Sequence, residues 1–124
     1  MTEGISGRRR ALAAMGATLL VPAAARAQSW PSRPVRLVIP FPPGGSTDIV
    51  GRLIGERLVQ ALGPAVLVEN RAGAGGTLGS DQVAKAPADG YTLLMATSST
   101  HAIAASLYSR LPYDPQRDFA PITL

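Results

Sequence analysis

Glycine and hydroxyl residues at the end of an apolar stretch form the strongest candidate site in this 124-residue sequence. The segment that carries them reads Phe41-Pro42-Pro43-Gly44-Gly45-Ser46-Thr47-Asp48. The glycines can turn sharply, Ser46 or Thr47 can cap the helix that follows, and the first-turn amides of that helix favour an anion. Asp48 is expected to stabilise this first turn, with contact to a ligand amine as its alternative role. The chemistry that these residues predict is the binding of a carboxylate or phosphate.

Two further loops carry donors of the same kind. The second loop contains Gly73-Ala74-Gly75-Gly76-Thr77, and the third contains Thr97-Ser98-Ser99-Thr100-His101. Backbone amides and hydroxyls dominate in both, which suits a small carboxylate that is recognised without a cationic clamp. For His101 a helix cap or a packed side chain is the simpler interpretation, and the scattered aromatic residues are expected to pack in the core or at its rim.

The elements that would position these loops alternate between strand and helix. Apolar runs predict strands over 35–39, 65–68 and 91–96, and helical spacing predicts helices over 47–62, 77–86 and 102–108. Residues 119–124 resemble the approach to a fourth strand. This alternation predicts an α/β fold with a parallel sheet and right-handed crossovers. All three loops would then meet at the carboxyl edge of the sheet, where open α/β sheets bind ligands.

Residues 1–27 predict an export signal. Arg8-Arg9-Arg10 forms a positive start, the eleven residues Ala11–Val21 are apolar, and Ala25-Arg26-Ala27 provides a cleavage site after Ala27. We therefore expect a periplasmic location, by either the general or the twin-arginine export route. An uncleaved anchor is the less favoured alternative because the apolar stretch is short for a membrane span.

Composition excludes several functional classes for the part after the signal. The signal holds four of the twelve basic residues and one of the eight acidic ones, so residues 28–124 carry eight basic and seven acidic side chains. Such a balance gives no reason to expect nucleic-acid binding. With no cysteine and one histidine in the sequence, we expect no catalytic residue, no metal site and no cofactor.

A nucleotide site is the strongest enzymatic alternative. Gly73-Ala74-Gly75-Gly76-Thr77-Leu78-Gly79 follows a predicted strand and opens a helix, but the stricter G-x-G-x-x-G pattern fails at Leu78. The next strand also ends without the acidic residue that a dinucleotide ribose needs. An exported nucleotide-binding enzyme subunit and a non-functional truncated remnant both remain alternatives to a binding protein.

Ordered blocks along residues 29–124 resemble one known family, the Bug or tripartite tricarboxylate transporter periplasmic substrate-binding proteins. The blocks are Trp30-Pro31-Ser32-Arg33-Pro34-Val35-Arg36, Pro40 to Asp48, Val68-Glu69-Asn70-Arg71-Ala72-Gly73-Ala74-Gly75-Gly76-Thr77, Ala86-Pro87-Ala88-Asp89-Gly90-Tyr91-Thr92-Leu93-Leu94, Thr100-His101-Ala102-Ile103, Leu111-Pro112-Tyr113-Asp114 and Asp118-Phe119-Ala120-Pro121. One departure is Ala104-Ala105, where the family pattern has Asn-Pro.

This resemblance implies a type II periplasmic-binding-protein fold, of which residues 28–124 would form the N-terminal portion of the first lobe. It implies capture of a small carboxylate, such as a di- or tricarboxylate, an aromatic acid or an amino acid, and delivery to integral-membrane transporter subunits. We expect a monomer. The candidate ligand-binding residues are Phe41, Gly44, Gly45, Ser46, Thr47, Asp48, Gly75, Gly76, Thr77, Ser98, Ser99, Thr100 and His101.

Overall fold

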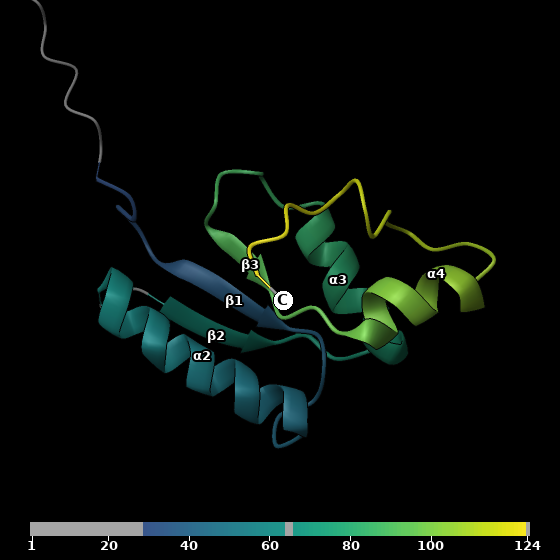
Figure 1. The fold of residues 1–124 in the computed structure, drawn as a ribbon, viewed down its shortest axis with the longest axis horizontal. Helices are drawn as coiled ribbons and strands as arrows, with labels where there is room; N and C mark the ends of the chain where they lie inside the picture. Colours follow the sequence, from purple (N-terminus) through teal and green to yellow (C-terminus); the bar gives the residue numbers. More distant parts are fainter. Residues whose placement is uncertain (1–28, 64–65, 124) are drawn as a thin grey trace, which may run out of the picture.

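In the computed structural model, helices and strands alternate along the described residues, 29–63 and 66–123 (Figure 1). The export signal expected over 1–27, with its cleavage site, lies outside these residues. The elements in chain order are β1 (Val35–Ile39), α2 (Ser46–Leu62), β2 (Val66–Asn70), the 3₁₀ turn η1 (Ala74–Gly76), α3 (Thr77–Ala84), β3 (Thr92–Leu94), the π-helical turn η2 (Ser99–Ile103) and α4 (Ala104–Leu107).

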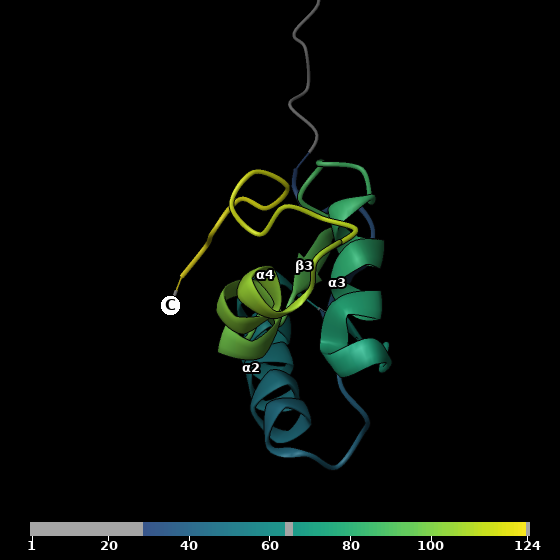
Figure 2. The same ribbon diagram turned by 90° about the vertical axis from the view of Figure 1, so that its right-hand side faces the viewer.

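The three strands form one parallel sheet in the order β2-β1-β3. Leu37 at the centre of β1 pairs with Val68 on one side and Leu93 on the other. Figure 2 shows α2 and α3 on opposite sides of this sheet. Because β1 is enclosed on both edges and both faces, Val35, Val38 and Ile39 are fully buried. The predicted α/β fold with a parallel sheet is confirmed.

Helix α2 packs on the sheet through its glycines rather than through its apolar side chains. A Cβ atom on Gly51 would lie 2.6 Å from Cδ1 of Ile39, and one on Gly55 would lie 2.7 Å from Cγ2 of Val68. The apolar spacing that predicted the helix marks its outer face instead, where Ile49 and Leu53 are 63% and 56% exposed. Small residues on the buried face let the helix backbone approach the sheet closely.

The bounds of strand β2, of α3 and of the last helical stretch differ from the predicted ones. Strand β2 continues to Asn70, past the predicted end at residue 68, because Glu69 and Asn70 still pair with Val38 and Ile39 of β1. Helix α3 ends at Ala84, two residues before the predicted end. The last helical stretch begins at Ser99, three residues before its predicted start, because a π-helical turn precedes α4.

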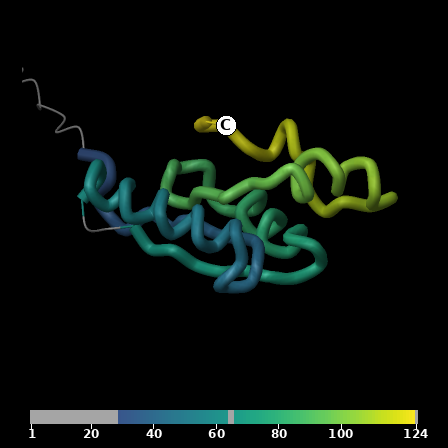
Figure 3. The backbone as a smooth tube through the Cα atoms, turned by 60° about the horizontal axis from the view of Figure 1, so that its bottom comes forward, coloured from purple at the N-terminus to yellow at the C-terminus, as the bar shows by residue number. Residues whose placement is uncertain are grey.

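The chain after α4 turns back toward the sheet (Figure 3). Tyr113 anchors this segment, since its ring is buried and its hydroxyl donates to the carbonyl of Thr100 at 2.7 Å. Phe119 packs edge-on against Tyr113 at 5.7 Å between ring centroids. Residues 119–123, whose sequence resembles the approach to a fourth strand, are not themselves part of a strand. Pro121 has no amide hydrogen to donate to a neighbouring strand.

No helix in the described ranges has the length and apolar character needed to cross a membrane.

Candidate functional site

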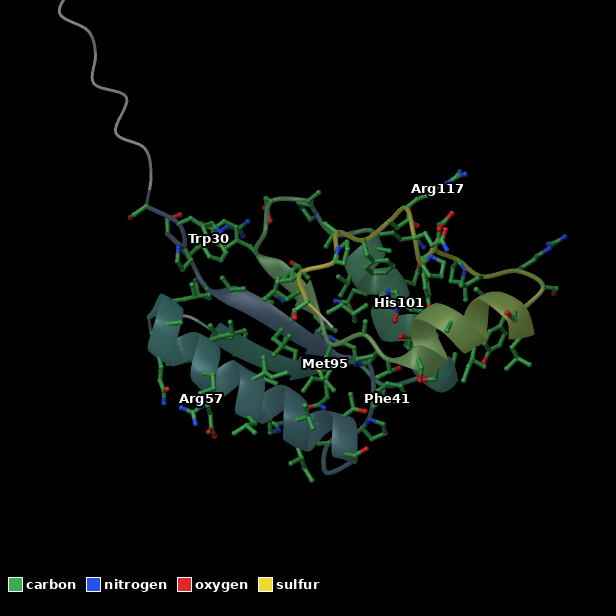
Figure 4. All side chains as sticks on the ribbon, in the orientation of Figure 1. Trp30, Phe41, Arg57, Met95, His101 and Arg117 are labelled. Atoms are coloured by element: carbon green, nitrogen blue, oxygen red, sulfur yellow. The ribbon has the colours of Figure 1, made fainter. Side chains whose placement is uncertain are left out.

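The three predicted loops meet at the carboxyl edge of the sheet, and Gly76 lies at their junction. A Cβ atom at Gly76 would be 2.7 Å from Cγ2 of Thr100 in the third loop and 3.0 Å from Cζ of Phe41 in the first. Figure 4 shows Phe41 between the start of α2 and α4, at the opposite end of β1 from Trp30. The predicted convergence of the three loops is confirmed by these contacts.

The first loop is closed by a residue inside the helix that follows it. Gly44 has φ +88°, and its amide donates to Oδ2 of Asp48 at 2.8 Å. Gly45 is the N-cap residue of α2, and its carbonyl accepts from the amide of Ile49 at 3.0 Å. The expectation that Ser46 or Thr47 caps the helix is therefore wrong: both lie past the N-cap position, from which a side chain reaches the first-turn amides.

Asp48 is the centre of a polar network that joins the first loop to β2. Its carboxylate accepts from Nε of Arg52 at 3.0 Å and from Nδ2 of Asn70 at 2.8 Å, and the same amide group of Asn70 donates to the carbonyl of Phe41 at 3.1 Å. Nη2 of Arg52 donates to Oδ1 of Asn70 at 2.8 Å. The hydrogen bonds from Arg52, Gly44 and Asn70 lower the pKa of Asp48 from its usual 3.8 to about 2.

Sequence analysis missed Arg52 and Asn70 as residues that shape the site. Arg52 stands one helical turn after Asp48, and Asn70 ends the strand beside β1. A polar residue at the carboxyl end of a parallel strand next to a glycine loop is the pattern that could have found Asn70.

Several donors of the first loop have no acceptor inside the structure. The amides of Ser46 and Thr47, and both of their hydroxyls, make no hydrogen bond to any residue in the described ranges. Ser46 is exposed and Thr47 is partly exposed, so solvent reaches this end of the helix. The first amides of a helix lack intrahelical partners and carry the positive end of its dipole, so this end of α2 can receive an anion.

The second loop contributes a main-chain donor and a tight turn. Gly75 and Gly76 both have positive φ, +67° and +91°, and within the described chain the Gly75 amide has no acceptor. Thr77 is buried and its hydroxyl donates to the carbonyl of Ala74 at 2.8 Å, so this side chain serves the turn itself.

The hydroxyls of the third loop bond mainly to one another. Thr100 is fully buried, donates to the carbonyl of Thr97 at 3.0 Å and accepts from the amide of Thr97 at 3.1 Å. The hydroxyls of Thr97 and Ser99 lie 2.8 Å apart, whereas Ser98 is exposed. Of the candidate hydroxyls in this loop, Ser98 is the one most open to solvent.

His101 packs among aromatic rings. Its ring centroid lies 4.7 Å from that of Phe119 and 6.2 Å from that of Tyr113, and its Nδ1 is 3.0 Å from the Thr100 hydroxyl. Burial lowers the pKa of His101 because it disfavours the charged imidazolium. The interpretation of His101 as a packed side chain is confirmed, and its contact with a ligand stays a prediction.

A hollow of about 680 Å³ lies between α4 and the returning segment. His101, Tyr108, Tyr113 and Asp118 are among the residues that line it. Tyr108 also borders the second loop, since its hydroxyl oxygen lies 3.3 Å from the position of a Cβ on Gly75. Sequence analysis expected Tyr108 to pack in the core or at its rim, because the aromatic residues are scattered along the sequence.

Comparison with known proteins gives consistent matches in sequence. A family model described as the tripartite tricarboxylate transporter family receptor matches residues 50–124. Protein BugT of Bordetella pertussis is 44% identical over 119 residues, which cover 93% of this chain and 36% of BugT. A Pseudomonas protein encoded in the tcbD–tcbE intergenic region is 46% identical over 120 residues, 95% of this chain and 35% of that protein.

Solved structures match the fold at similar identity. MatC from Rhodopseudomonas palustris with bound malate gives a TM-score of 0.71 at 44% identity, over 74% of this chain and 31% of MatC. An R. palustris protein solved with adipate gives 0.66 at 44% identity, over 69% of this chain and 29% of that protein. The chain therefore has part of a periplasmic-binding-protein fold and spans about a third of the length of these relatives.

Proposed function

The chain belongs to the tripartite tricarboxylate transporter family of receptors, and we propose that it forms part of a periplasmic protein that binds a small carboxylate. The observation that carries this proposal is the meeting of three loops at one sheet edge, where the amides of Ser46, Thr47 and Gly75 have no acceptor in the described chain. A carboxylate offers the acceptors that these amides lack. Malate and adipate, bound by two structural relatives, belong to this class of ligand.

Binding would rest on neutral donors rather than on a charge clamp. The positive end of the α2 dipole attracts the ligand carboxylate, and main-chain amides and the Ser46 and Thr47 hydroxyls donate to it. The ionised Asp48 does not repel the ligand strongly, because Arg52 lies 3.0 Å from its carboxylate and offsets the charge. No bond is broken, so the protein acts as a receptor and not as an enzyme.

The remaining parts of the proposal concern the complete polypeptide. Residues 1–27 would direct export, residues 28–124 would form the N-terminal portion of the first lobe, and a second lobe would close over the ligand by a hinge motion. The proposal also includes delivery of the ligand to integral-membrane transporter subunits and a monomeric state of the receptor. The ligand would be a di- or tricarboxylate, an aromatic acid or an amino acid.

Substitution of Gly45 by valine tests the first loop directly. Gly45 has φ −79°, and a Cβ there would meet only the carbonyl oxygen of Pro42, at 3.8 Å, so the backbone accepts a side chain at this position. Calorimetric titration of the complete polypeptide with malate and adipate should show binding of at least one acid, weakened about tenfold or more by Gly45→Val. Ala61→Val, on the exposed side of α2, is the matched control and should bind like wild type.

The alternatives give different results in the same assay. Thermal stabilisation by ATP or NAD without any response to carboxylates would favour a nucleotide-binding enzyme subunit. A polypeptide that is unfolded before any ligand is added would favour a truncated remnant. Equal affinity of Gly45→Val and wild type would remove the first loop from the site.

A further inference from the structure

The three tyrosines of this chain differ in what their hydroxyls contact. The Tyr91 hydroxyl accepts from the Ser32 amide at 2.9 Å, and the Tyr113 hydroxyl donates to the Thr100 carbonyl at 2.7 Å. The Tyr108 hydroxyl makes no hydrogen bond to any residue between 29 and 63 or between 66 and 123. A phenol that stabilises a fold normally has such a partner. The Tyr108 hydroxyl is therefore available to a group outside the described chain.

The backbone fixes Tyr108 beside the second loop. Tyr108 ends α4 with φ −96° and ψ 125°, and its amide donates to the carbonyl of Ala104 at 3.0 Å. Its hydroxyl oxygen lies 3.3 Å from the position of a Cβ on Gly75, whose own amide also lacks an acceptor in the described part of the chain. Two donors, the phenol O–H of Tyr108 and the main-chain N–H of Gly75, thus lie close together at the sheet edge where the loops meet.

The Tyr108 side chain is partly exposed and lines the hollow between α4 and the returning segment. Tyr108 is 43% exposed and lines the space of about 680 Å³ that His101 and Tyr113 share. A phenol O–H can donate a hydrogen bond to a carboxylate oxygen. The ring is rigid, with two side-chain torsions, and little entropy is lost when it contacts a ligand.

We propose that Tyr108 is a ligand-contacting residue, whose hydroxyl donates a hydrogen bond to the ligand carboxylate alongside the Gly75 amide. This assignment rests on the proposed function and deepens it, because it adds a side-chain donor to a site otherwise built from main-chain amides and small hydroxyls. A hydrogen bond to a carboxylate is stronger than one between neutral groups, so Tyr108 would contribute to the preference for anionic ligands.

Tyr108→Phe in the complete polypeptide tests this proposal, with Tyr91→Phe as the matched control. Calorimetric titrations with malate and adipate should show about tenfold weaker binding by Tyr108→Phe of each acid that wild type binds. Tyr91→Phe removes a hydroxyl near Trp30, at the far end of β1, and should leave affinity unchanged. The melting temperature of ligand-free Tyr108→Phe should equal that of wild type, because no bond within the described fold is lost.

The outcomes separate this proposal from the proposed function. If wild type binds an acid and Tyr108→Phe binds it equally well, Tyr108 is not a ligand contact, although the receptor function stands. If Tyr108→Phe melts several degrees lower without ligand, the hydroxyl has a structural partner and the assignment is overturned. If wild type binds neither malate nor adipate, the binding of dicarboxylates, which is part of the proposed function, fails together with this assignment.

Discussion

The Asp48 carboxylate accepts a hydrogen bond of 2.8 Å from the amide of Gly44, four residues earlier in the chain. The same carboxylate accepts hydrogen bonds from the side chains of Arg52 and Asn70. One buried acid therefore holds the loop before α2 in place and links it to β2. The loop that the sequence marks as an anion site therefore already contains an anion of its own. Under the proposed function, the ligand carboxylate would bind to donors that do not bond to Asp48.

Asp48→Asn should make the protein less stable at neutral pH and should weaken its response to acid. The pKa of Asp48 is about 2 in the folded state and near 3.8 when unpaired, so its charge stabilises the fold above pH 3.8. This stabilisation is lost as the pH falls through about 2. Urea unfolding at several pH values should show a gap between wild type and Asp48→Asn that narrows from pH 4 to pH 2. A gap of constant size over that range would contradict the role of the ionised carboxylate.

Asn70→Ala should destabilise the complete polypeptide by about 1–3 kcal/mol. The substitution leaves the Phe41 carbonyl and one oxygen of Asp48 without their donor, and it removes the acceptor of Nη2 of Arg52. Denaturant unfolding measures the loss. Gln60→Ala is the matched control, because this exposed amide has only a 3.4 Å contact with Arg57 and should change stability by less than about 0.5 kcal/mol. Equal effects of the two substitutions would show that Asn70 does not hold the loops together.

Local sequence patterns predicted the elements around the site because those patterns act over short distances. The apolar run at Val35–Ile39 and the glycine stop at Gly63 are both local features, and the structure has β1 and the end of α2 there. The face of α2 that meets the sheet was not predictable from apolar spacing. Gly51 and Gly55 allow close packing only because Ile39 and Val68 lie opposite them, and the helix sequence does not contain that information. Apolar spacing indicates a helix with an apolar face, but it does not indicate how closely the helix backbone approaches the sheet.

The network at the site depends on residues that are far apart in the chain. Asn70 bonds to Phe41 across 29 positions, and Tyr108 reaches the second loop from the end of a later helix. Local periodicity cannot predict contacts between residues so far apart in the sequence. Sequence analysis therefore predicted the three loops but not the side chains that connect or flank them. The same limit explains the cap of α2: a glycine N-cap with Asp48 bonded back to Gly44 looks, in sequence, like a hydroxyl cap.

Gly76→Ala should destabilise the fold by about 1–3 kcal/mol more than Gly75→Ala. Both glycines are in the left-handed region, with φ +91° and ψ −5° at Gly76 and φ +67° and ψ +23° at Gly75, so alanine strains the backbone at either position. The difference lies in the surroundings. A Cβ at Gly76 would be 2.7 Å from Thr100 and 3.0 Å from Phe41, whereas one at Gly75 would have near it only the hydroxyl oxygen of the exposed Tyr108, at 3.3 Å. Thermal or denaturant unfolding of both variants measures the difference, and equal losses would argue against close contact of the three loops.

The single histidine should titrate below its ordinary pKa, and its protonation should destabilise the protein. Burial beside Phe119 and Tyr113 lowers the pKa of His101, so the folded state holds this ring neutral more strongly than the unfolded chain does. The unfolded chain then binds more protons on acidification, and the stability present above pH 6.5 is lost as the pH falls through the lower folded value.

Two measurements check this expectation for His101. NMR titration of the His101 ring, assigned by the resonance that disappears in His101→Asn, should give a pKa below 6.5. Urea unfolding from pH 7.5 to pH 5 should show wild type losing more stability than His101→Asn, which has no imidazole to protonate at this position. Because each comparison is a difference between two variants, other titrating groups cancel. A ring pKa at or above 6.5 would mean that a nearby negative charge, rather than burial, controls this residue.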